Sequence, residues 1–168
     1  GLYRKSIRED SKLYKDGASD MVDLFYRAWL KEGYVAFRQQ QYASALSTYR
    51  AVVADTERKN DTAPDARTLV TRAKVTHVAQ AYNGMGDVEL ADAGGDVRRA
   101  LRSYQMVSAL LNAPDDVLAY SLGKQIECYR KIVETDFSKE TEDAQKARAW
   151  YSTLIARLEE QKRAIEGS

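Results

Sequence analysis

Few residues of this chain could do chemistry on a substrate. His77 is the only histidine and Cys128 the only cysteine among 168 residues, so one copy of the chain cannot build a zinc site from paired histidines or cysteines. His77 lies between Val75 and Val78 in a helical pattern, where a hydrogen-bonded structural histidine or a groove-facing one is far more common than a catalytic base. We expect Cys128 to be a small, buried apolar residue.

An acidic segment is the other place where chemistry could occur. Asp87, Glu89, Asp92 and Asp96 have the composition of a calcium loop, but Asp92 occupies the position where an EF-hand needs glycine. We therefore expect a solvated loop over 87–95 that could serve as a contact surface. The chain also lacks a glycine-rich phosphate loop and a Gly-x-Ser-x-Gly motif. The sequence thus predicts a protein that is not an enzyme and that holds no metal or cofactor.

The composition limits the class of protein. Hydrophobic residues make up 44% and charged residues 30% of the chain, which argues against a disordered segment and against a membrane protein. No apolar run approaches the roughly 20 residues that a membrane-spanning helix needs. The 26 basic and 25 acidic residues give a net charge of +1, without the basic excess typical of nucleic-acid binders. Two prolines and nine glycines favour long helices in one globular domain.

One pattern occurs three times: an alanine, a tyrosine four residues later and an aliphatic residue three residues after that. This spacing places the three side chains on one stripe of a helix. A small residue opposite an aromatic one lets two helices approach closely. We expect the three tyrosines and Trp29 to be largely buried, with Ala45 and Ala100 at close helix contacts. The copies are Ala45–Tyr49–Val52, Ala100–Tyr104–Val107 and Ala147–Tyr151–Leu154.

Six main helices are expected, and the three stripes lie on three of them. Pro64 and Pro114 mark the starts of two of them, because proline is tolerated at the first helical position. Asp115 and Asp116 suit the positive end of a helix dipole. Residues 2–16 could form a further short helix. The six main helices are expected at about 20–40, 42–58, 64–85, 96–112, 115–135 and 140–166.

The residues at these places resemble the tetratricopeptide (TPR) repeat, a helix–turn–helix unit. The strongest match is in the first unit, where tryptophan, glycine, tyrosine, alanine and tyrosine stand at the family's characteristic spacing. Later units keep fewer of these positions, and the alanine-to-alanine intervals are 55 (45 to 100) and 47 (100 to 147) against about 34 in the family. The matching residues are Trp29, Gly33, Tyr42, Ala45 and Tyr49, then Ala81, Tyr82, Gly86, Asp87, Ala100 and Tyr104, then Leu122, Gly123, Ala147 and Tyr151.

The resemblance implies an all-α fold: a right-handed stack of three antiparallel helix pairs preceded by an N-terminal helix. A single closed four-helix bundle is the alternative. Residues 1–19 would form an N-terminal segment and 20–168 the repeat domain, with units at about 20–60, 63–112 and 114–166.

The resemblance also implies a function, since the first helices of stacked TPR-like units line a concave groove. We expect a non-catalytic interaction module or scaffold that binds a protein or peptide segment there, with Arg38 and Lys124 meeting carboxylates of the partner. Nucleic acid is not an expected partner. The alternative is that Tyr34, Phe37 and Tyr120 pack under the N-terminal helix and that the arginine and lysine side chains are simply solvated. The expected groove residues are Tyr34, Arg38, His77, Gln80, Tyr120 and Lys124.

A second hypothesis is a structural subunit that assembles through its terminal helices. The last helix carries apolar residues near the heptad period, with Trp150 beside them, and such a helix favours cover by a partner or by a second copy. The compartment stays open, because the chain begins with Gly1 rather than methionine. It would be the cytoplasm or, if an N-terminal signal has been removed, the periplasm or the exterior.

Overall fold

The computed structural model describes residues 19–59, 67–92, 95–110 and 112–167, and every regular element in this part of the chain is an α-helix. The expected all-α class is therefore confirmed for the described residues. None of their helices is long and apolar enough to cross a membrane. The helices are α3 (Ser19–Arg38), α4 (Tyr42–Lys59), α5 (Arg67–Ala91), α6 (Val97–Ala109), α7 (Asp115–Asp136) and α8 (Glu142–Glu166).

Most helix ends agree with the sequence-based expectation to within about three residues. The exception is the C-terminal end of α5, because the prediction of a loop over 87–95 is wrong for most of its length. The helix continues to Ala91, so Asp87 and Glu89 lie on a helix instead of in a solvated loop. The expected helix at 2–16 and the start signal at Pro64 lie outside the described residues.

Local signals explain the starts of the later helices. Asp96 caps α6, and its side chain accepts a hydrogen bond from the backbone N–H of Arg98 at 2.9 Å. Pro114 stands just before α7, whose first turn contains the expected Asp115 and Asp116. The hydroxyl of Thr141 caps α8.

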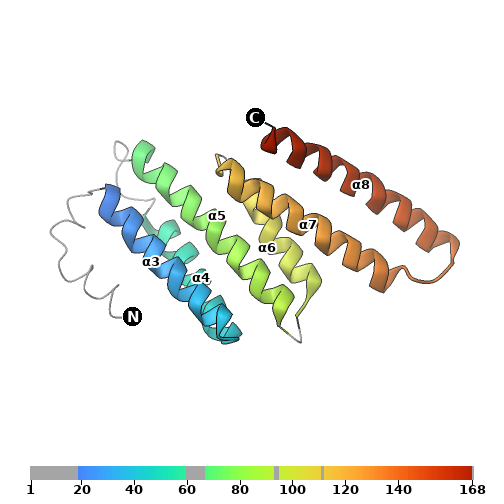
Figure 1. The fold of residues 1–168 in the computed structure, drawn as a ribbon, viewed down its shortest axis with the longest axis horizontal. Helices are drawn as coiled ribbons and strands as arrows, with labels where there is room; N and C mark the ends of the chain where they lie inside the picture. The colour runs from blue at the N-terminus through green and yellow to red at the C-terminus, as the bar shows by residue number, and fades with distance from the viewer. Residues whose placement is uncertain (1–18, 60–66, 93–94, 111, 168) are drawn as a thin grey trace.

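Three helices form a row. Figure 1 shows α3, α5 and α7 side by side, with α4 and α6 behind them and α8 beyond α7 at one end. Each helix packs against the next one in the chain, and α5 also contacts both α3 and α7. Residues far apart in sequence thus come together on the side of the row that faces away from α4 and α6, here called the α3–α5–α7 face.

The core lies between the row and the helices behind it. Phe25, Tyr26 and Trp29 of α3 pack with Tyr49 and Val52 of α4 in one cluster. A second cluster joins α6 and α7, and it contains the buried Cys128, as expected. Trp29, Tyr49, Tyr104, Ala45 and Ala100 are all buried, which confirms those predictions. Tyr151 is only half-buried.

Glycines set how closely the helices approach. A Cβ atom at Gly33 would lie 2.7 Å from Tyr49 Cε1, and one at Gly84 would also lie 2.7 Å from that atom. One at Gly86 would lie 2.5 Å from Tyr104 Cζ. These rings lie directly on the helix backbone, so glycine is needed here for close contact and not for a turn. Gly84 and Gly86 thus lie within α5 at contacts with tyrosine rings.

Candidate partner-binding face

Asp87 lies at the centre of the α3–α5–α7 face and links three helices. Its Oδ1 accepts a hydrogen bond from the Tyr104 hydroxyl of α6 at 2.7 Å and another from the Tyr120 hydroxyl of α7 at 2.7 Å. Its Oδ2 accepts no hydrogen bond from the described residues. One carboxylate oxygen of Asp87 thus joins α5 to both α6 and α7.

Burial controls the electrostatics around this carboxylate. Burial raises the pKa of Asp87 above its ordinary value, even though the two tyrosine hydrogen bonds and the charge of Lys124 oppose the shift. Burial also raises the pKa of Tyr49 to about 12, with the Asp87 charge adding to the shift. The pKa values of Tyr104 and Tyr120 are raised by burial and then by Asp87. These phenols thus stay protonated at neutral pH and act as hydrogen-bond donors.

Two adjoining hollows open on this face and share Tyr34, Asp87 and Tyr120. The first, here called the central hollow, has a volume of about 530 Å³ and lies among α3, α5 and α7. The second has a volume of about 410 Å³ and is bordered by more basic side chains. The central hollow also contains Tyr49, Gln80, Asn83 and Asp116, and the second also contains Arg38, Lys124, Glu127 and Lys131.

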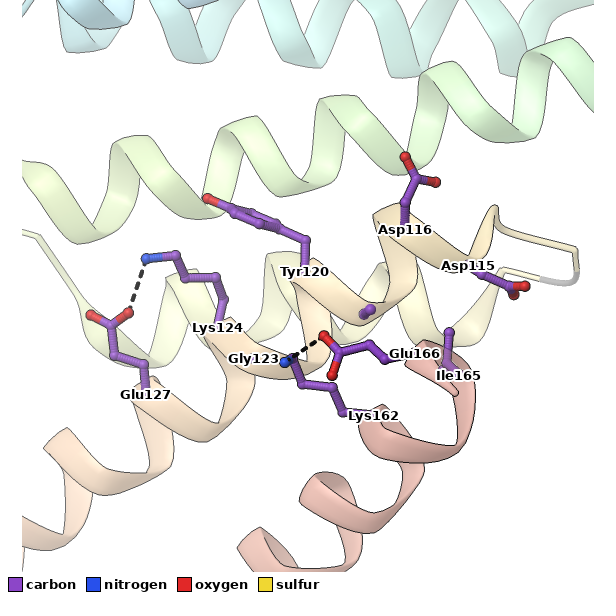
Figure 2. A pocket seen from close by; sticks show the side chains of 10 residues that line it. Asp115, Asp116, Tyr120, Gly123, Lys124, Glu127, Lys162, Ile165 and Glu166 are labelled. Atoms are coloured by element: carbon purple, nitrogen blue, oxygen red, sulfur yellow. Dashed lines mark hydrogen bonds and ion pairs between the residues drawn. The ribbon is translucent and has the colours of Figure 1, made fainter. Parts of the chain in front are cut away.

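A third hollow of about 680 Å³ continues the same surface between α7 and α8. Figure 2 shows Tyr120 and Lys124 at one side of it and the C-terminal end of α8 at the other. Lys162 pairs there with Glu166 at 2.7 Å, and Lys124 pairs with Glu127 at 2.9 Å. The cations in this hollow are thus already held by anions of the same helix.

Five of the six expected groove residues line the first two hollows: Tyr34, Arg38, Gln80, Tyr120 and Lys124. Tyr34 and Tyr120 are exposed large aromatic residues, 42% and 45% accessible. Arg38 donates a hydrogen bond to the Tyr34 hydroxyl at 3.0 Å, and Lys124 lies 6.0 Å from the centre of the Tyr120 ring. The geometry brings these side chains onto one surface, and whether they bind a partner stays a prediction.

The placement of His77 in the groove is wrong, because its side chain is only 1% exposed. Its Nε2 lies 3.0 Å from Asp23 Oδ1, and its ring stacks on Tyr26 with centres 5.0 Å apart. A buried imidazole needs such a polar partner, and α3 supplies it. His77 therefore helps to join α3 to α5.

The sequence-based site omitted Asp87, which was assigned to a loop, and Tyr49, which was assigned to the core alone. Asn83, which also lines the central hollow, was not among the six expected groove residues. A signal for Asp87 does exist: Gln80, Asn83 and Asp87 follow one another at intervals of three and four residues, which places them on one stripe of a continuous helix. Ending the expected helix at residue 85 concealed that stripe.

Two features of the described residues bear on metal binding and on nucleophilic chemistry. The described residues contain no group of three or more histidine, cysteine or carboxylate side chains placed to hold a metal ion. Burial raises the pKa of the Cys128 thiol to about 11, so this thiol is not an activated nucleophile. Comparisons with protein-family models, with curated proteins and with solved structures find no match.

Proposed function

We propose that this protein is a TPR-like interaction module whose α3–α5–α7 face docks an extended segment of a partner protein without catalysis. The observation that carries the proposal is the continuous surface in which Tyr34, Gln80, Asp87, Tyr120 and Lys124, from three successive row helices, border adjoining hollows. Such a surface offers flat aromatic contacts together with hydrogen-bonding groups, which is the usual chemistry of peptide recognition.

The helix order supports a repeat architecture. In this proposal α3–α4, α5–α6 and α7–α8 are three antiparallel pairs in a right-handed stack, and the first helix of each pair belongs to the row. The contacts of α5 with both α3 and α7 fit such nearest-neighbour stacking. In this arrangement a linear segment would cross the row and meet each pair in turn.

The aromatic residues are the expected main contributors to binding. Tyr34 and Tyr120 are large and more than two-fifths exposed, and tyrosine gives much contact area for little lost conformational entropy. The basic groups Lys31, Arg38 and Lys124 surround them. Added salt should therefore weaken the attraction between these cations and acidic groups of the partner.

Affinity capture from a lysate of the source organism tests the proposal. The test variant is Tyr34→Ala/Lys124→Ala, and the matched control is Arg102→Ala/Met106→Ala on α6, whose side chains are also exposed. Loss of a central aromatic contact should weaken binding by about 1–2 kcal/mol or more. We expect the test variant to lose the partner and the control to retain it. Equal capture by both variants would contradict the proposal.

A structural subunit that assembles through α8 is the second candidate. The observation that favours it is Trp150, which is 60% exposed and packs edge to face on Tyr151, with ring centres 4.8 Å apart. An exposed tryptophan of this kind is common at protein interfaces. Light scattering over a range of concentrations tests this function: a dimer that Trp150→Ser abolishes supports it, and a monomer at every concentration contradicts it.

A further inference from the structure

Two hydrogen-bond acceptors of the central hollow lack donors. Asp87 Oδ1 receives both tyrosine hydroxyls, and Oδ2 receives none from the described residues. Asn83 Nδ2 donates to the Val117 carbonyl at 3.1 Å, which fixes the orientation of the amide, and the buried Asn83 Oδ1 has no partner. A buried acceptor without a donor is unfavourable. A donor that a partner brings to Asp87 Oδ2 would therefore be favourable.

The two acceptors lie close to each other along α5. Asn83 and Asp87 are separated by four residues of one helix, so their side chains leave the same face one turn apart. Both residues line the central hollow. A basic group bound at Asp87 Oδ2 would thus lie one helical turn from the Asn83 amide.

The cations of the described residues do not fill this role. Arg27 pairs with Asp23 at 2.7 Å, and Lys124 pairs with Glu127 at 2.9 Å. Lys31 lies 4.9 Å from the centre of the Tyr34 ring. No lysine or arginine in the described part of the chain forms an ion pair with Asp87. The centre of the face is thus an acceptor site with cations placed around it.

Aromatic rings complete the lining. Tyr34, Tyr49 and Tyr120 border the same hollow as Asp87. Lysine and arginine pack their methylene stems on apolar surfaces while the charged end reaches a polar group, and tyrosine rings attract cations. The combination of a free carboxylate oxygen with tyrosine rings therefore suits a long basic side chain.

We propose that the central hollow is a subsite for one lysine or arginine side chain of the partner segment. The ammonium or guanidinium donates to Asp87 Oδ2, one helical turn from the Asn83 amide, and its stem lies against Tyr34 and Tyr120. Neutral or acidic residues flank this basic residue, because Lys31 lines the central hollow and Arg38 and Lys124 line the adjoining one. The inference rests on the proposed function and adds the chemistry of the partner to it.

Selection from a random peptide library, with the purified protein as target, tests the subsite. Three targets are compared: the wild type, Asp87→Asn, and the control Asp115→Asn, whose carboxylate lies outside the central hollow. We expect peptides selected on the wild type and on Asp115→Asn to share one lysine or arginine position. Peptides selected on Asp87→Asn should lack it.

A measurement on the peptide side keeps the test independent of how well Asp87→Asn folds. The shared basic residue of a selected peptide is replaced by norleucine, and its affinity for the unchanged wild-type protein is measured. Loss of a charge-assisted hydrogen bond predicts about tenfold weaker binding or more. Arginine and lysine versions of the peptide show which of the two the hollow prefers.

Two results separate this inference from the proposed function. Selected peptides that compete with one another and yet lack a common basic residue, or that tolerate norleucine without loss, would overturn the subsite alone. A library that yields no peptide sensitive to Tyr34→Ala would overturn segment docking on this face and the subsite with it.

Discussion

The first two copies of the alanine–tyrosine pattern differ from the third in what their tyrosines contact. Tyr49 packs on the backbone at Gly33 and Gly84, and Tyr104 packs on the backbone at Gly86. Tyr151 instead lies beside other rings, with its centre 5.7 Å from that of Tyr129. The same spacing in sequence thus produces a tight helix contact only where the facing helix offers a glycine.

The hydrogen bonds of the tyrosine hydroxyls also differ between the second and third copies of the pattern. The Tyr104 hydroxyl donates to Asp87, whereas the Tyr151 hydroxyl makes no hydrogen bond to the described residues. Ala144 is the one buried residue of α8, while α6 buries five residues in a shorter helix. We expect α8 to open before the other described helices do, because few buried contacts hold it.

The largest expected effect comes from Gly86→Ala. The new methyl group would lie 2.5 Å from Tyr104 Cζ, and a buried ring cannot move away as a flexible side chain can. Overpacking of this kind should destabilise the protein by about 2–3 kcal/mol, more than the gain in helix propensity. Urea denaturation followed by circular dichroism measures the change. An unchanged midpoint would show that Tyr104 does not pack on this backbone.

Replacing the alanine of the pattern by leucine should destabilise the second copy more than the third. Ala100 is fully buried, so Ala100→Leu should lower the free energy of unfolding by about 1–3 kcal/mol. Ala147 of the third copy is half-buried, and Ala147→Leu should change it by about 0.5 kcal/mol or less. Equal effects in the two variants would remove the proposed difference in packing.

A glycine in the third unit should respond with the opposite sign. A Cβ atom at Gly123 would lie 3.4 Å from Lys162 Cε, which is the mobile end of a long side chain. Since alanine favours a helix over glycine, Gly123→Ala should raise the free energy of unfolding by about 0.5–1 kcal/mol. Thermal denaturation of Gly123→Ala and Gly86→Ala compares the two glycines directly. Destabilisation by both substitutions would contradict the expected difference in sign.

The smallest effect is a pH dependence at the Asp87–Tyr104 contact, which the third copy lacks. Because burial raises the pKa of Asp87 above the ordinary 3.8, the folded state holds the proton more tightly than the unfolded state does. The stability linked to this group is present below about pH 3.8 and is lost as the pH rises through the higher pKa of the folded state. Asp87→Asn removes this loss while keeping an oxygen acceptor.

The melting temperature of Asp87→Asn relative to that of the wild type should therefore be higher at about pH 7 than at about pH 3. Asp115→Asn, whose carboxylate is exposed, serves as the control and should show little difference. A relative stability of Asp87→Asn that falls as the pH rises would mean that the tyrosine hydrogen bonds outweigh burial.

The sequence predicted the helices better than their contacts. Local periodicity and acidic first-turn residues such as Asp115 depend on near neighbours, so most helix ends agree with expectation. The expected helix ended at residue 85, before Gly86, and the role of that glycine within α5 depends on Tyr104, a residue on another helix. Local patterns carry no information about such a partner.

The dependence on residues of other helices also explains which residues of the candidate site were predicted and which were missed. Tyr34, Gln80 and Tyr120 were placed on one surface from the resemblance to TPR units, and they do line the central hollow. His77 was misplaced because the position of α3, which supplies Asp23 as its partner, could not be known from its own helix. Asp87 was missed as a consequence of ending α5 too early.

Site-specific photocrosslinking is the most direct test of the central claim that the α3–α5–α7 face binds a partner protein. A photoreactive amino acid replaces either Tyr34 on the face or Met106 on α6, two side chains of nearly equal exposure at 42% and 43%. After irradiation in cells of the source organism, the account predicts one discrete crosslinked species from position 34 and none from position 106. The same species from both positions, or one from position 106 alone, would contradict it.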